Sequence, residues 1–131
     1  QVYGLRAYYM YQLYRSWGDA VFTEEPSLGF EVGKLAKAAT PAAEIFEQVK
    51  KDIESSLSYF GPDYTIKEKK SLWSKAATLM LKADVYLWSA HRDGGEGDAR
   101  TAKNALVDIQ NNISRSNLDL MDTYQECLSY R

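Results

Sequence analysis

The sequence predicts an all-α fold of antiparallel helix pairs, arranged as a tetratricopeptide-like right-handed superhelix. Apolar residues recur at helical spacing in four stretches, and Gly or Pro follows the points where helices should stop. The last three stretches also start about thirty residues apart, close to the tetratricopeptide period of about 34. With 131 residues, 45% apolar and 26% charged, the chain is expected to form a single all-helical domain over residues 1–131.

The first helix is predicted near residues 2–17. Two apolar stripes run along it at helical spacing: Leu5, Tyr9, Leu13 and Trp17 in one, and Tyr3, Ala7, Met10 and Tyr14 in the other. Two stripes indicate two packing partners, so this helix is expected at the buried centre of the fold. Gly18 is placed to end it, and an irregular stretch over 19–39 follows.

Three more helices are predicted near residues 41–60, 71–91 and 98–115. Thr40 is expected to cap the first of them, with Ile45, Val49 and Ile53 on its buried face. The helix over 71–91 is predicted to be the hub of the fold, because its broad apolar side carries many small residues. That side comprises Leu72, Trp73, Ala76, Leu79, Met80, Ala83, Tyr86, Leu87 and Ala90. A flexible break at Gly94, Gly95 and Gly97 should precede the last helix, whose apolar positions are Ala102, Leu106, Ile109 and Ile113. A short final turn is expected to hold Met121, Tyr124 and Leu128.

Charge and cysteine content argue against several classes of partner. Sixteen Lys and Arg against eighteen Asp and Glu give a formal charge of −2, too balanced to attract nucleic acid through the net field. Lys67, Lys69 and Lys70 are interpreted as a solvated helix approach. Cys127 is the only cysteine in the sequence, which rules out an internal disulfide and a site of several cysteines. No cofactor and no metal are predicted.

No catalytic motif is recognisable. His91 is the only histidine and is interpreted as a favourable charge near a helix C-terminus. The glycines over 94–97 follow no strand and precede no Lys, so they do not match a phosphate-binding loop. The acidic residues Glu24-Glu25 and the pair Asp119 and Asp122 are neighbours only in sequence and are interpreted as solvated surface. The protein is therefore not expected to be an enzyme.

Aromatic residues are abundant: ten Tyr, three Trp and four Phe. Sugar rings stack their C–H faces on aromatic side chains, while their hydroxyls need polar partners nearby. Most aromatics lie on stripes predicted to face the core. The exception is Trp17, at a helix exit with Arg15, Asp19 and Phe22, so Trp17 and Asp19 are the candidate carbohydrate-binding residues.

Three ordered blocks of the sequence support a family resemblance. The first is an aromatic helix that ends in Gly-Asp, the second an amphipathic helix over 40–57, and the third an alanine-rich helix ending in Val-Tyr-Leu-Trp. They read Arg6-Ala7-Tyr8-Tyr9 with Leu13-Tyr14-Arg15, Trp17-Gly18-Asp19 and Glu24-Glu25-Pro26; then Thr40-Pro41 to Leu57; then Lys75-Ala76-Ala77 to Val85-Tyr86-Leu87-Trp88. This order resembles the SusD/RagB family, and residues 102–113 and 118–124 resemble its next segment. Ala20-Val21-Phe22 departs from the family, which commonly has a proline there.

The resemblance implies a fragment of a larger SusD-like fold. It implies a lipoprotein on the external face of the outer membrane, lipid-anchored through a segment that precedes this one, that captures oligosaccharide or polysaccharide with a TonB-dependent transporter. This segment would act mainly as helical scaffold. The alternative from the helical pattern alone is a tetratricopeptide-type scaffold that binds proteins and no sugar.

Overall fold

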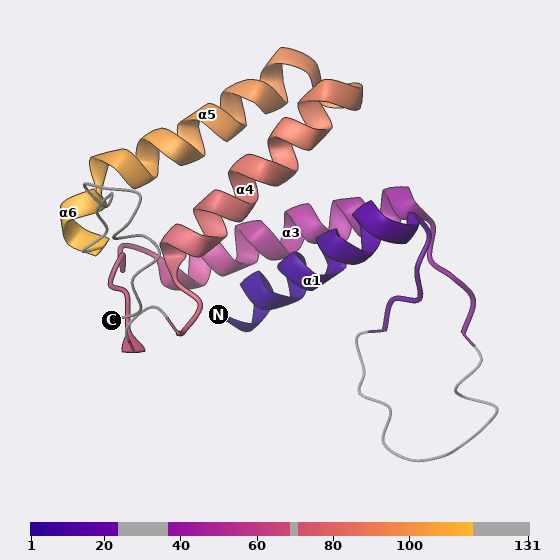
Figure 1. Cartoon of the computed structure of the whole chain (residues 1–131), viewed down its shortest axis with the longest axis horizontal. Coiled ribbons are helices and arrows are strands. Elements are labelled where there is room, and N and C mark those ends of the chain that lie inside the picture. The colour runs from indigo at the N-terminus through magenta and orange to yellow at the C-terminus, as the bar shows by residue number, and fades with distance from the viewer. Residues whose placement is uncertain (24–36, 69–70, 117–131) are drawn as a thin grey trace, which may run out of the picture.

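The computed structural model describes residues 1–23, 37–68 and 71–116 of the chain (Figure 1). These ranges form six helical elements: α1 Val2–Trp17, α3 Ala42–Phe60, α4 Lys75–Ser89, the π-helical η2 Ala90–Gly94, α5 Gly95–Asn111 and the short α6 Ile113–Ser116. The described residues hold no strand, and Ala20 and Thr40 pair only as an isolated antiparallel bridge. The all-α prediction is confirmed.

The helices form two antiparallel pairs. Figure 1 shows α1 and α3 side by side and running in opposite directions, and α4 and α5 paired in the same way. The two pairs meet mainly where α4 lies against α3. The predicted arrangement of antiparallel helix pairs is therefore present.

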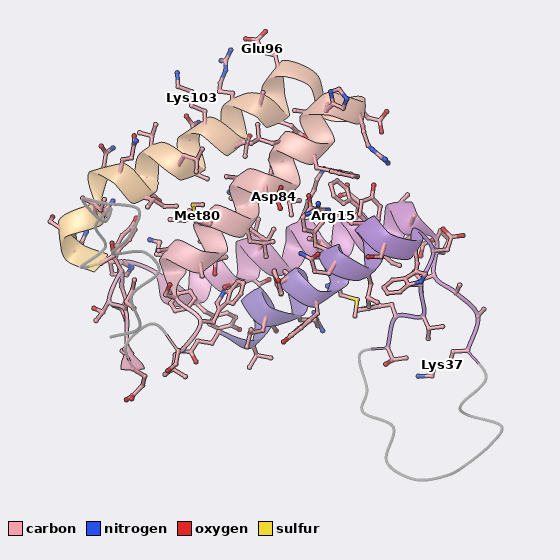
Figure 2. The ribbon with its side chains drawn as sticks, viewed as in Figure 1. Arg15, Lys37, Met80, Asp84, Glu96 and Lys103 are labelled. Atoms are coloured by element: carbon pink, nitrogen blue, oxygen red, sulfur yellow. The ribbon has the colours of Figure 1, made fainter. Side chains whose placement is uncertain are left out.

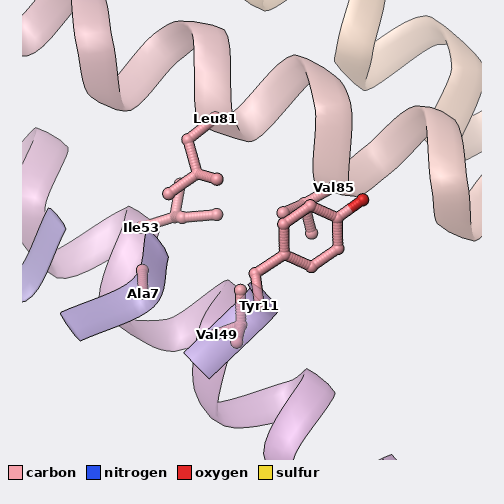
Figure 3. Close-up of a cluster of buried hydrophobic side chains, with 6 residues drawn as sticks. All are labelled: Ala7, Tyr11, Val49, Ile53, Leu81 and Val85. Carbon is pink, nitrogen blue, oxygen red and sulfur yellow. The ribbon is translucent and has the colours of Figure 1, made fainter. Parts of the chain in front are cut away.

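Two apolar clusters hold the pairs together. One lies where α1, α3 and α4 meet and is drawn in Figure 3; it comprises Ala7, Tyr11, Val49, Ile53, Leu81 and Val85. The other joins α4 to α5 and comprises Tyr64, Leu79, Ala83, Ala102 and Ala105. Since α4 contributes to both clusters, it has the hub position that its small residues predicted. Alanines at the second contact let the helix backbones approach closely.

The prediction for the first helix is wrong in one respect. Tyr9 and Trp17 are 62% and 72% exposed, so the stripe that contains them does not face the core. The buried residues of α1 are instead Gly4, Ala7 and Tyr11. Among the described residues α1 packs mainly on α3 and only lightly on α4. One narrow face of α1 is therefore buried, and the other positions of the helix are partly or largely open to solvent.

The prediction for α3 is correct in its face, because Ile45, Val49 and Ile53 are all buried. On α4, however, Met80 and Leu87 are 56% and 52% exposed, although both were predicted to be buried. Those two positions lie seven residues apart and therefore share a face that none of the described helices covers.

The ends of α4 and α5 also differ from the prediction. Ser74 accepts a hydrogen bond from the Ala77 amide at 3.2 Å and so starts α4 at Lys75, four residues later than predicted. The glycine stretch is not a flexible break, because it forms η2 and the first turn of α5. On α5 the buried positions are Ala102 and Ala105, whereas Leu106 is 38% exposed. The predicted final turn and Cys127 lie outside the described residues.

Candidate functional site

The exit of α1 presents the indole of Trp17 to solvent. Gly18 ends the helix with a φ of 73°, and its amide donates to the Tyr14 carbonyl at 3.0 Å. A glycine is favoured there because a positive φ is strained for residues with a side chain. The turn leaves Trp17 72% exposed, a position from which an indole could stack on a sugar ring. Its contact with a sugar remains a prediction.

Asp19 has a structural partner. Its Oδ1 accepts a hydrogen bond of 2.8 Å from the Ala42 amide, in the first turn of α3. The backbones of Ala20 and Thr40 then exchange two hydrogen bonds of 3.3 and 2.9 Å. Thr40, expected as the cap of this helix, makes no side-chain cap bond, and Asp19 supplies the acceptor in its place. Asp19 therefore fixes the start of α3 to the end of α1, and its role toward a sugar stays a prediction.

The structure does not gather Arg15 and Phe22 beside these two residues. The guanidinium of Arg15 lies 3.6 Å from the carboxylate of Asp84 on α4, and both are labelled in Figure 2. Phe22 instead lies near α3, with its ring 5.8 Å from the guanidinium carbon of Arg6. The four residues that the sequence grouped at the helix exit therefore face different neighbours.

A groove of about 420 Å³ runs along the start of α3, and we call it the α3 groove. One aromatic ring and several polar groups line it, in the mixture that sugars require. The lining residues are Phe22, Thr40, Ala43, Glu44, Ile45, Glu47, Gln48 and Lys51. Sequence reasoning missed this groove because its polar residues occupy the solvated face of an amphipathic helix, where charged residues carry no distinctive signal.

A buried ion pair fixes one wall of the α3 groove. The Nε and Nη2 atoms of Arg6 donate to the two carboxylate oxygens of Asp52, each at 2.6 Å. The same carboxylate accepts a hydrogen bond of 3.0 Å from the Gln48 amide. Asp52 is only 2% exposed, and a buried charge is costly unless it is paired. Arg6 and Gln48 supply the partners that compensate this charge. The hydrogen bond to Asp52 thus orients the side chain of Gln48, which lines the α3 groove.

The titratable groups with clear shifts do not point to acid–base chemistry. Burial raises the pKa of Tyr11 to about 12, and the nearby Asp84 carboxylate adds to the effect. Burial also raises the pKa of Tyr64 to about 12, together with a 2.6 Å hydrogen bond to Asp108. Both phenols therefore stay protonated at neutral pH. Exposed Asp63 has a pKa below its usual value, because the Thr65 amide donates to it at 2.9 Å.

Of the remaining candidates from the sequence, the structure describes only His91. His91 lies exposed in η2. The acidic residues Glu24-Glu25, Asp119 and Asp122 lie outside the described residues. Within residues 1–23, 37–68 and 71–116, no group of three His, Cys, Asp or Glu side chains is placed to hold a metal ion. In the same ranges, no helix combines the length and the apolar character that crossing a membrane requires.

The solved structures that are similar to this chain include the following three. NanU of Bacteroides fragilis has 42% sequence identity and a TM-score of 0.83, and the match covers 98% of this chain and 24% of that one. A SusD superfamily protein of Bacteroides vulgatus has 41% identity and a TM-score of 0.75, with 91% and 23% of the two chains covered. A second SusD superfamily protein, from B. fragilis, has 32% identity and a TM-score of 0.77, with coverage of 96% and 25%.

The chain therefore spans about a quarter of the length of the solved structures that it matches. No family model and no curated protein matches the sequence. Identity of 32–42% over more than nine-tenths of this chain is a likeness of sequence as well as of fold.

Proposed function

This chain belongs to the SusD superfamily over the helical segment that it shares with those structures, and we propose that it serves in the non-catalytic capture of glycans at a cell surface. The full protein would be a lipoprotein on the external face of the outer membrane. It would bind oligosaccharide or polysaccharide and pass it to a TonB-dependent transporter. The observation that carries the proposal is the sequence identity of 32–42% to those solved structures.

Within that function, this segment would act mainly as scaffold. Its aromatic side chains support the assignment, because Tyr11 is fully buried and Tyr14, Phe46, Trp73 and Tyr86 pack against the apolar clusters. Trp17 and Tyr9 are exposed on α1, and the indole of Trp17 is free to stack on a sugar. The α3 groove adds polar groups on the same helix pair.

Calorimetry with the complete protein and a panel of glycans tests the proposal. We expect binding of at least one oligosaccharide, with no turnover of the bound sugar. Trp17→Ala should weaken binding, because it removes the exposed stacking surface, whereas Trp17→Phe should retain most of it. Binding of no glycan in the panel, or hydrolysis of a bound one, contradicts the proposal.

The second candidate is a helical scaffold that binds a protein and no sugar. Exposed apolar side chains on α1 and on α4 favour it, because Tyr9, Met80 and Leu87 are residue types that protein interfaces bury. The two candidates respond differently to one variant. Met80→Asp should abolish a protein contact at this face and should leave glycan affinity unchanged.

A further inference from the structure

A second cleft, of about 290 Å³, opens where the last turns of α1, the first turns of α3 and the end of α4 converge. We call it the Trp88 cleft. Three aromatic side chains line it, one from each of these helices: Tyr14, Phe46 and Trp88. The rings of Tyr14 and Phe46 stack with their centroids 4.8 Å apart. The cleft therefore offers an apolar surface built from aromatic rings, assembled from three separate parts of the chain.

Among the described residues, no hydrogen-bond acceptor meets the indole N–H of Trp88. Its nitrogen is shielded from solvent. The indole of Trp73 is different, since its N–H donates to the Thr78 hydroxyl at 2.8 Å. A buried donor without an acceptor costs free energy, so native proteins nearly always satisfy it. The unsatisfied indole donor of Trp88 is thus an observation independent of the shape of the cleft.

The charged groups around the cleft are balanced in sign. Lys50 and Arg92 line it together with Glu47 and Asp93. Lys50 is held in place, with its Nζ 3.5 Å from Glu47 and 4.9 Å from the centre of the Phe46 ring. Two cations and two anions give no preference for a charged ligand, yet they supply both donors and acceptors. Hydroxyl groups, which both donate and accept, match such a lining.

We propose that the Trp88 cleft binds one unit of an uncharged saccharide. Ring C–H groups of the sugar would lie on the aromatic surface, and one of its oxygens would accept the hydrogen bond of the Trp88 indole. The guanidinium carbons of Arg92 and Arg15 lie 4.8 and 5.3 Å from the centre of the Trp88 ring, and the exposed Arg92 side chain would move aside to admit the sugar. This inference rests on the proposed glycan-binding function and adds a site to it.

The three tryptophans allow a direct test, because Trp17 is exposed, Trp73 already has an acceptor and Trp88 has none. The protein is labelled with ¹⁵N on its indoles, and the signals are assigned from Trp→Phe variants. Maltose, cellobiose, lactose and chitobiose are then titrated in turn. We expect the Trp88 N–H signal to shift to saturation with at least one of these sugars, while the Trp73 signal stays in place.

Affinity measurements complete the test. Trp88→Phe keeps an aromatic ring and removes the donor, so it should lower affinity about tenfold, whereas Tyr59→Phe, at an exposed ring outside the cleft, should leave affinity unchanged. Circular dichroism confirms that both variants fold. A Trp88 signal that stays in place with every sugar overturns the inference and indicates a water molecule as the acceptor. Preference for galacturonic acid over the neutral sugars overturns it as well.

The same experiment separates this inference from the function on which it rests. If sugars bind and Trp17→Ala weakens their binding while the Trp88 signal does not move, the Trp88 cleft is not a sugar-binding site and the proposal of glycan capture stands. If calorimetry detects no sugar at all, both are overturned.

Discussion

Arg6 of α1 and Asp52 of α3 are joined by two parallel hydrogen bonds, each 2.6 Å long. The planar guanidinium meets the carboxylate in the geometry that gives the strongest charge-assisted pairs. Because α1 packs along α3, this one pair fixes the register of the first helical hairpin. It also supports Gln48, which lines the α3 groove.

Removal of Arg6 is expected to destabilise the fold strongly. Arg6→Ala leaves the buried Asp52 charge uncompensated, and breaking such a pair from one side typically costs 3–5 kcal/mol. Since the Arg6 side chain is 28% exposed, we expect about 3 kcal/mol, the lower end of that range, measured by urea unfolding. Arg100→Ala is the matched control, because the pair of Arg100 with Glu96 is exposed and should contribute less than about 0.5 kcal/mol. Equal effects of the two variants would contradict this account.

Gly4 is expected to tolerate no side chain. A Cβ atom at this position would lie 2.7 Å from Cδ1 of Trp73, well inside van der Waals contact. Gly4→Ala should therefore push the indole away and lower the free energy of unfolding by about 1–3 kcal/mol. Gly97→Ala provides the opposite case, because its Cβ would meet no atom within 4 Å. That variant should stabilise α5 by about 0.5–1 kcal/mol, and a loss of stability would contradict this expectation.

The structural and sugar-binding roles of Asp19 can be separated. Asp19→Ala removes the acceptor for the Ala42 amide and should lower stability by about 1 kcal/mol, as loss of a helix cap does. Asp19→Asn retains an acceptor and should lose less. Trp17→Ala, at an exposed position, should stay within about 0.5 kcal/mol of the parent. If thermal unfolding shows no effect of Asp19→Ala, the bond to α3 does not contribute to stability.

Stability is expected to fall at high pH. The pKa values of Tyr11 and Tyr64 are raised from 10.0 to about 12 in the folded protein, so folding favours the protonated phenols. Their contribution is complete below about pH 10 and is lost as the pH rises toward about 12, because the unfolded chain releases these protons first. Urea midpoints measured across this range should decline. The decline should be smaller in a variant that carries Tyr11→Phe and Tyr64→Phe, and an unchanged slope would contradict the prediction.

The sequence was sufficient for the presence of the helices and for the stops of α1 and α3, because these depend on local signals. Gly18 and Gly61 end α1 and α3 at positive φ, and the period of Ile45, Val49 and Ile53 identifies the buried face of α3. The exposure of Tyr9 and Met80 could not be predicted in the same way. It depends on which helices are present to cover them, and a stripe of apolar residues does not specify its neighbour.

The candidate site likewise combines features that local sequence signals predict with features that depend on tertiary packing. The sequence placed Trp17 both on a stripe expected to face the core and at a helix exit as a candidate sugar contact, and the structure leaves it 72% exposed at that exit. The bond from Ala42 to Asp19 joins residues 23 positions apart, and no local pattern announces it. The Trp88 cleft draws on three helices at once, so its composition emerges only when the chain is folded.

The contacts between residues 19–20 and 40–42 close the first hairpin at one point of the backbone. None of these contacts draws on residues 21–39, and the entropy of closing a loop grows only slowly with its length. We expect these anchors to hold α1 against α3 when the span between them differs in length, so this end of the helical frame does not depend on one particular connection.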